Sequence, residues 1–130
     1  MKKKVLIIGL GLIGGSLGLA LRESPQVEII TGYDQDGAVC DRAVAMGAVE
    51  RTVGLREGAE QADVIIICTP LGVYRSVIEQ IAPVLKPGVL LTDVGSTKVQ
   101  VMELFSTLPS GVHAIGGHPM AGAETQGIGG

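Results

Sequence analysis

The chain has 130 residues, of which 46% are hydrophobic and 18% are charged, and its formal net charge is −3. The length is close to that of one compact domain, and the apolar fraction excludes an intrinsically disordered segment. The one basic run, residues 2–4, is too short to indicate a nucleic-acid surface, and no apolar run is long enough to cross a membrane. Glycines interrupt the first apolar stretch and no cleavage site follows it, which excludes a signal peptide.

The two cysteines, Cys40 and Cys68, lie far apart in the sequence and lack the spacing of metal ligands. Cys68 ends a fully apolar run, so we expect buried, reduced thiols, no metal site and a cytoplasmic protein.

Short aliphatic runs alternate along the chain with longer segments of helical periodicity. The pattern predicts strands at 5–8, 27–33, 63–68, 89–92 and 112–115, and helices at 13–22, 37–46, 71–85 and 99–108. Strands that are apolar on both faces belong to parallel sheets covered by helices. The sequence therefore predicts a single α/β domain of the Rossmann type, with a doubly wound, mainly parallel sheet and helices on both faces. Residues 116–130 include six glycines and little pattern, so we expect the chain to stop within a loop, as a domain truncated at its C-terminus.

A glycine motif, G-x-G-x-x-G, stands at residues 9–14 between the first predicted strand and the first predicted helix. In this position Gly9 makes the tight turn, Gly11 lets the backbone approach a pyrophosphate, and Gly14 with Gly18 allows close packing of helix and sheet. The N–H groups at the start of the helix, including those of Leu12 and Ile13, then favour phosphate. The alternative is an ordinary glycine-rich turn.

An aspartate, Asp34, ends the second predicted strand 20 residues after Gly14. Its carboxylate can accept hydrogen bonds from ribose hydroxyls and would repel the additional phosphate of NADP, so the sequence predicts NAD as the cofactor. The alternative is a solvated carboxylate or a helix cap, with Asp36 as a further candidate for the cap. Thr69 and Pro70 follow the strand at 63–68, where we expect their backbone to meet the cofactor; Pro70 also suits the start of a helix.

Three segments carry a family resemblance: residues 9–21, the DVGSTK segment at 93–98 and the GGHPMAGAE segment at 116–124. Together they closely resemble the prephenate and arogenate dehydrogenase family, and the GGHPMAG segment is the most specific of the three. The resemblance implies an NAD-dependent oxidoreductase that converts prephenate to 4-hydroxyphenylpyruvate by oxidative decarboxylation, in tyrosine biosynthesis.

Such a reaction needs a group that accepts the proton of a ring hydroxyl, and histidine suits this near neutral pH. The resemblance assigns this role to His118, and it makes Ser96 a residue that positions the substrate hydroxyl, nicotinamide and histidine. Glu124 matches an acidic residue at the mouth of the family's site, whereas Ala123 stands where many relatives carry a hydroxyl residue. The alternatives are a structural role for His118 and a helix cap for Ser96.

The family has a second, largely helical domain that completes the substrate site and mediates dimerisation. We expect residues 1–130 to be the NAD-binding domain alone, which is inactive by itself. We expect the full-length protein to be a homodimer that acts on a small molecule and binds neither nucleic acid nor membrane. Three functions remain open: a prephenate dehydrogenase, an arogenate dehydrogenase, and a non-catalytic NAD-binding sensor or interaction module.

Overall fold

The computed structural model describes residues 2–93 and 113–115. Within these ranges helices and strands alternate along the chain, as the hydrophobic pattern predicts. The strands are β1 (Lys3–Ile8), β2 (Val27–Tyr33), β3 (Arg51–Thr52), β4 (Val64–Ile67), β5 (Leu90–Asp93) and β6 (His113–Ile115). The helices are α1 (Leu12–Leu21), α2 (Gly37–Ala45), α3 (Leu55–Gln61) and α4 (Leu71–Ile81), and α4 continues into a 3-10 turn, η1 (Ala82–Val84).

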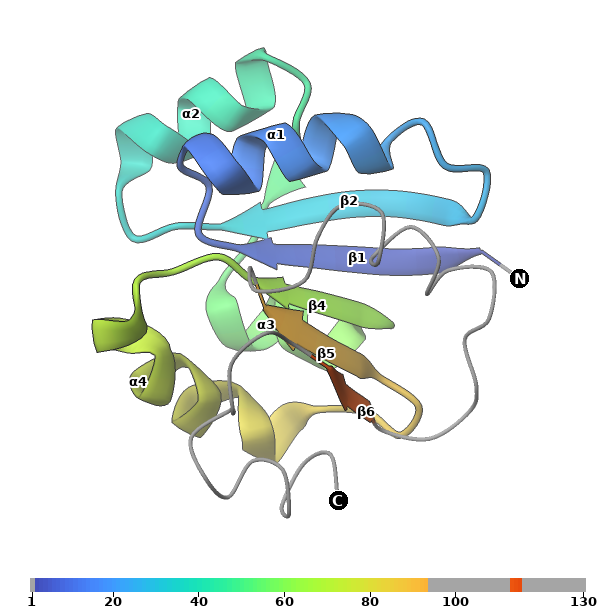
Figure 1. The fold of residues 1–130 in the computed structure, drawn as a ribbon, viewed down its shortest axis with the longest axis vertical. Coiled ribbons are helices and arrows are strands. Elements are labelled where there is room, and N and C mark those ends of the chain that lie inside the picture. Colours follow the sequence, from blue (N-terminus) through green and yellow to red (C-terminus); the bar gives the residue numbers. More distant parts are fainter. Residues whose placement is uncertain (1, 94–112, 116–130) are drawn as a thin grey trace.

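The described strands form one six-stranded sheet in the order β3-β2-β1-β4-β5-β6. Every neighbouring pair is parallel; Val5 of β1, for example, pairs with Ile30 of β2 on one side and with Val64 of β4 on the other. The chain winds outward from β1 to β3 and then returns to β4, so the winding direction reverses between β1 and β4 (Figure 1). This is the predicted Rossmann-type fold, which is confirmed.

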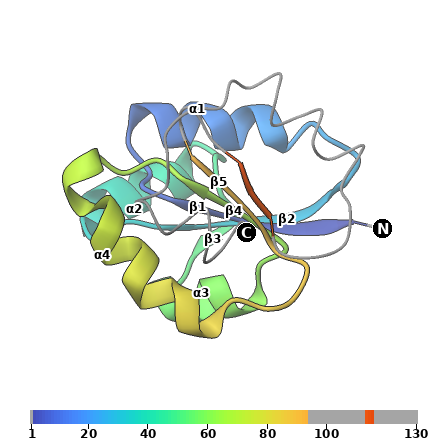
Figure 2. The ribbon, with the colours of Figure 1, turned by 60° about the horizontal axis from the view of Figure 1, so that its bottom comes forward.

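Helices cover both faces of the sheet: α1 and α2 lie on one face, and α3 and α4 on the other (Figures 1 and 2). Alternate residues of β1 supply the two cores. Val5 and Ile7 pack with the α1 side, and Leu6 and Ile8 pack with the α3 and α4 side. All four are at most 1% exposed. The central strands therefore read as unbroken apolar runs because both of their faces are covered.

The structure departs from the predicted elements in three places. The pattern did not predict β3 and α3, because β3 has two exposed residues and α3 has seven residues rich in charge. The helix predicted for 71–85 ends at Ile81, before Pro83 of η1, because proline disrupts helical hydrogen bonding. The helix predicted for 99–108 and the loop predicted for 116–130 lie outside the described residues.

Two further predictions concern the cysteines and a membrane-spanning segment. Both cysteines are free, as predicted, but each is only partly buried, so the prediction that they are buried was wrong. Cys40 still packs at the edge of the core, where its sulfur lies 3.3 Å from the carbonyl oxygen of Asp34. In the described part of the chain no helix is long and apolar enough to span a membrane.

Candidate functional site

A cleft of about 590 Å³ lies at the carboxyl ends of β1, β2 and β4. In Figure 1 the carboxyl ends of these strands form the left edge of the sheet, toward which the arrowheads of β1 and β2 point. Ligands of open α/β sheets bind at this edge, at the point where the strand order reverses. The cleft is lined by Gly9, Gly11, Leu12, Ile13, Gly14, Tyr33, Asp34, Gln35, Leu55, Cys68, Thr69, Pro70, Val73, Ser76, Val77 and Gln80. Every residue that the sequence predicted for the cofactor is therefore brought to one cavity.

Gly9 makes the tight turn between β1 and α1, as predicted. Its φ is +97°, which side chains other than glycine rarely adopt, and its N–H donates to the carbonyl of Tyr33 at 2.7 Å. A Cβ at Gly9 would stand 2.9 Å from the carbonyl carbon of Cys68, so the turn also packs tightly against the end of β4. This turn ties together the ends of β1, β2 and β4 beneath the cleft.

The other glycines of the motif have separate tasks. A Cβ at Gly14 would collide with the carbonyl oxygen of Gly9, so this glycine lets the helix begin directly on the turn. A Cβ at Gly18 would collide with the carbonyl oxygen of Ala48, in the segment between α2 and β3 rather than in a central strand. Gly11 differs from both, because no heavy atom lies within 4 Å of the position its Cβ would take. The open side of Gly11 leaves room for a ligand.

Helix α1 begins at the cleft without a side-chain cap. Its N-cap is Gly11, and the first turn contains no acidic residue. The first N–H groups of an α-helix have no partner within the helix and carry partial positive charge. Leu12 and Ile13, the first two residues of α1, are 82% and 62% exposed and both line the cleft. The start of α1 therefore has the properties of an anion-binding site.

Asp34 connects the glycine turn to the end of β2. One carboxylate oxygen accepts a hydrogen bond from the N–H of Leu10, and the other accepts one from the N–H of Asp36, both at 2.9 Å. The cap of α2 is Asp36, whose side chain accepts from the N–H of Ala38 at 2.9 Å. The alternative in which Asp34 caps this helix is therefore wrong. Because each carboxylate oxygen has two lone pairs, Asp34 can still accept hydrogen bonds from a ligand in the cleft.

Thr69 and Pro70 form the far wall of the cleft, after β4. Pro70 occupies the N-cap position of α4 with φ −60°, and it also lines the cleft. The start of a helix and a position at the cleft are therefore compatible for this residue. The hydroxyl oxygen of Thr69 is buried and has no hydrogen-bond partner. Buried polar atoms are nearly always paired, so an unpaired hydroxyl beside an open cleft favours a polar ligand there.

The wall that α4 contributes to the cleft was not predicted from the sequence. Val73 and Val77 of α4 supply an apolar wall together with Leu55 of α3, and Gln80 lies one turn beyond Val77. Residues 73, 77 and 80 recur at the spacing that places side chains on one face of a helix. That spacing was visible in the sequence, but only the fold shows that part of this face is turned to the cleft.

A buried polar pair joins α4 to the end of β5. The hydroxyl of Tyr74 donates to a carboxylate oxygen of Asp93 at 2.9 Å, and the two residues are 5% and 1% exposed. Burial, the hydrogen bond and the charge of Asp93 all raise the pKa of Tyr74. Burial, with a smaller contribution from the charge of Asp93, raises the pKa of Cys68 to about 12. The Cys68 thiol therefore stays protonated at neutral pH and is a poor nucleophile.

The predicted substrate-side residues Ser96, His118 and Glu124 lie outside the described residues. The strands that precede them are described. β5 ends at Asp93, three residues before Ser96, and β6 ends at Ile115, three residues before His118. These two strands are parallel neighbours in the sheet. The segments that contain Ser96 and His118 therefore come directly after neighbouring strand ends, at the carboxyl edge of the sheet.

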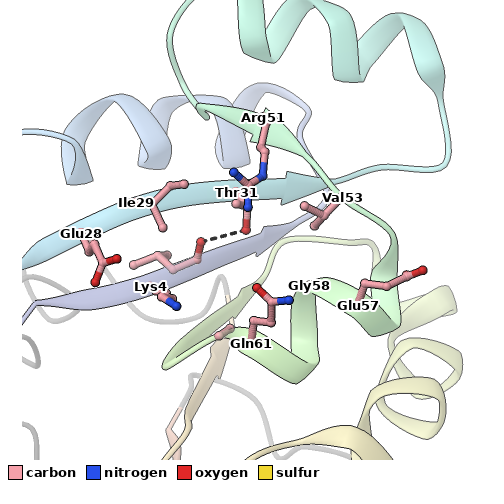
Figure 3. A pocket seen from close by; sticks show the side chains of 11 residues that line it. Lys4, Glu28, Ile29, Thr31, Arg51, Val53, Glu57, Gly58 and Gln61 are labelled. Atoms are coloured by element: carbon pink, nitrogen blue, oxygen red, sulfur yellow. Dashed lines mark hydrogen bonds between the residues drawn. The ribbon is translucent and has the colours of Figure 1, made fainter.

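A second hollow, of about 320 Å³, lies on the α3 side near the amino ends of β1 and β2 (Figure 3). Side chains of both charges surround it, including Lys4, Glu28 and Arg51, and the hydroxyl of Thr31 donates to the carbonyl of Val5 at 3.2 Å. This hollow shares no lining residue with the glycine-rich cleft. The predicted site residues that the structure describes all lie at the cleft.

Comparison with known proteins identifies a family. Residues 17–130 match the family model described as prephenate dehydrogenase, nucleotide-binding domain. A prephenate dehydrogenase of Lactococcus lactis subsp. cremoris (strain MG1363) is 45% identical over 130 residues, which cover 97% of this chain and 36% of that protein. The chain thus spans about a third of the length of this curated relative.

Solved structures agree with the sequence relatives. Prephenate dehydrogenase from A. aeolicus, crystallised with hydroxyphenyl propionate and NAD+, superposes with a TM-score of 0.69 at 28% identity, over 94% of this chain and 43% of that one. Arogenate dehydrogenase from Synechocystis superposes with a TM-score of 0.67 at 34% identity, over 89% of this chain and 40% of that one.

Proposed function

The chain belongs to the prephenate dehydrogenase family, and from this membership we propose that its cleft binds NAD in an enzyme that oxidises prephenate. The observation that carries the proposal is the placement of Asp34. Its carboxylate is hydrogen-bonded to the N–H of Leu10 within the glycine turn and lines a cleft of about 590 Å³ at the switch point of the sheet. Dinucleotides bind to Rossmann-type folds at this place.

The described residues fit a dinucleotide. The open side of Gly11 and the uncapped start of α1 suit a pyrophosphate, which needs close backbone approach and N–H donors. The unpaired hydroxyl of Thr69 offers a further hydrogen bond. The apolar wall that Leu55 and Val77 contribute suits a flat base such as adenine.

Asp34 supports NAD rather than NADP. A carboxylate at the end of β2 accepts hydrogen bonds from the ribose hydroxyls of NAD and repels the 2′-phosphate of NADP. Of the residues that line the cleft, none is lysine or arginine, so the described wall offers no cation for that phosphate.

In the proposed reaction prephenate is oxidised and decarboxylated to 4-hydroxyphenylpyruvate, a step toward tyrosine. His118 accepts the proton of the ring hydroxyl, and Ser96 positions that hydroxyl; Glu124 lies at the mouth of the substrate site. NAD supplies the acceptor for the hydride. These assignments rest on the match of the segments at 93–98 and 116–124 to the family motifs and on the adjacent ends of β5 and β6.

The proposed enzyme contains more than this domain. The chain covers 36% of the length of the relative from L. lactis, which leaves room for a second domain that completes the substrate site. We assign to that domain the groups that bind the substrate carboxylates and the contacts of a homodimer. The two free thiols accord with a cytoplasmic enzyme.

Arogenate is the second candidate substrate. The observation that favours it is the 34% identity to the Synechocystis arogenate dehydrogenase; the L. lactis prephenate dehydrogenase is more similar, at 45% identity, so prephenate stays the first candidate. Arogenate differs from prephenate by an amino group on the side chain.

The test has two stages. Calorimetric titration of the protein with NAD and with NADP should show clearly tighter binding of NAD, and equal affinities would contradict the role of Asp34. The full-length protein is then assayed with prephenate and with arogenate, by following NADH absorbance. Turnover of neither substrate, with NAD binding intact, would reject the dehydrogenase and leave a binding module.

For the catalytic assignment, His118→Asn should abolish turnover in the full-length protein while leaving NAD affinity within about twofold, because histidine acts on the substrate proton. His113→Asn is the matched control, since His113 begins β6 and has no proposed role. Retained turnover in the His118 variant would refute its assignment as the base.

A further inference from the structure

The buried pair of Tyr74 and Asp93 has no part in the function proposed so far. Asp93 is only 1% exposed, and removal of a carboxylate from water is costly even when it is hydrogen-bonded. Tyr74 holds it in place with a hydrogen bond of 2.9 Å from α4. The pair therefore fixes a carboxylate at one position, at the carboxyl end of β5.

The position is close to the cleft. In the register of the sheet Asp93 pairs with Ile67, the last residue of β4. Cys68 follows Ile67 and lines the cleft. The charge of Asp93 contributes to the raised pKa of the Cys68 thiol. The negative potential of the buried carboxylate is therefore felt at the cleft wall, because a low-dielectric interior screens it weakly.

The next step rests on the proposed function, that is, on NAD in the cleft. A dinucleotide lies across the switch point, with one mononucleotide over each half of the sheet. Asp34, at the end of β2, belongs to the half that receives the adenosine ribose. Asp93 and Cys68 belong to the other half, that of β4 to β6, and this half receives the nicotinamide.

The nicotinamide ring is a cation in NAD+ and is neutral in NADH. A fixed negative charge near this half attracts the oxidised ring and has little effect on the reduced one. We propose that Asp93, held by Tyr74, sets the preference of the protein for the oxidised cofactor. Asp93 thereby favours binding of NAD+ before the reaction and release of NADH after it. It acts through its charge, without contact to the reacting atoms.

The test is the ratio of two dissociation constants, Kd of NADH over Kd of NAD+, measured by calorimetric titration of the full-length protein. For unit charges about 10 Å apart in a medium of effective dielectric about 20, loss of the charge should lower this ratio roughly tenfold. Asp93→Asn is the variant, because asparagine keeps the shape and can still accept the hydrogen bond from Tyr74.

Two further variants separate charge from structure. Asp63→Asn removes the same charge at the opposite edge of the sheet, where Asp63 precedes β4 and pairs with Lys86 at 2.9 Å. It should leave the ratio unchanged. Tyr74→Phe removes the hydrogen bond that holds the carboxylate but keeps the carboxylate itself, so the ratio should fall by less than it does in Asp93→Asn. An equal shift in Tyr74→Phe and Asp93→Asn would assign the effect to packing and overturn the inference.

The remaining outcomes are also decisive. If wild-type protein binds no NAD+, the proposed function itself fails; if it binds NAD+ and Asp93→Asn leaves the ratio unchanged, only this inference fails. If Asp93→Asn does not fold, wild-type protein is titrated with ADP-ribose, NADH and NAD+. Addition of the cationic ring to ADP-ribose must then strengthen binding more than addition of the neutral ring, and an equal or smaller gain overturns the inference.

Discussion

Asparagine in place of Asp34 would remove one negative charge from the cleft while it keeps the size of the side chain. In the structure both carboxylate oxygens accept backbone hydrogen bonds, one from Leu10 and one from Asp36. Asparagine has only one acceptor oxygen, so one of these N–H groups loses its partner. Because the side chain is partly exposed and water can replace the lost bond, the free energy of unfolding should fall by only about 1 kcal/mol.

The effect on ligand preference should be larger. Unit charges 4 Å apart repel by about 4 kcal/mol at an effective dielectric of 20, and partial exposure of Asp34 reduces this value. We therefore expect removal of the charge to improve NADP binding relative to NAD binding by about 1–2 kcal/mol, or roughly five- to thirtyfold. NAD itself should bind more weakly, because the ribose hydroxyls lose a charged acceptor.

The assay is calorimetric titration of Asp34→Asn and wild type with NAD and with NADP at constant ionic strength. Asp36→Asn is the matched control, since it removes the same charge two residues away, outside the cleft, and asparagine caps helices as well as aspartate does. An unchanged NAD-to-NADP ratio in Asp34→Asn, or an equal change in Asp36→Asn, would refute the reasoning.

Three other predictions follow from the same structure. Gly11→Ala should lower the free energy of unfolding by only about 1 kcal/mol or less, because alanine is a poorer N-cap than glycine but its Cβ meets no protein atom. It should nevertheless abolish NAD binding, since the Cβ occupies the space left for pyrophosphate, and retained NAD affinity would contradict this. Gly14→Ala should lower the free energy of unfolding by about 2 kcal/mol or more in denaturant titration, because its Cβ collides with the Gly9 carbonyl, and wild-type stability would show that the turn adapts. Stability should also fall as the pH rises from 9 toward 12, because burial raises the pKa of Cys68 to about 12 and the unfolded chain, with a Cys68 pKa near 9.0, loses that proton first. The raised pKa of Tyr74 adds to this fall above about pH 10. Cys68→Ser should therefore reduce the slope in circular-dichroism titrations, most clearly between pH 9 and 10, and an unchanged slope there would refute the assignment.

The strands and the motif could be read from the sequence because their signals are local. β2 was predicted with the bounds that the structure shows, and β1 and β4 were found from continuous apolar runs that require cover on both faces. The turn at Gly9 and the start of α1 follow from the glycine spacing. The elements that were missed, β3 and α3, are short and exposed, so hydrophobic periodicity could not detect them.

The roles of individual side chains were less predictable. Both Asp34 and Asp36 were candidates for the cap of α2, and only the backbone geometry shows that Asp36 takes it while Asp34 bonds to the glycine turn. Gly18 was expected to pack on the sheet, yet it packs on the carbonyl of Ala48. The contact of Asp34 with Leu10 joins residues 24 positions apart, and that of Gly18 with Ala48 joins residues 30 positions apart. No local pattern encodes contacts over such separations.

The sequence by itself determined the doubly wound fold, the position of the glycine turn and the position of Asp34 beside it, because the hydrophobic pattern and the glycine spacing are local features of the chain. The tertiary structure decided which side chains from distant elements share the cleft. It also brought the Asp93 carboxylate of β5 against Tyr74 of α4 and close to Cys68. Electrostatic effects depend on distances in space and on burial, and both quantities exist only once the helices have packed on the sheet.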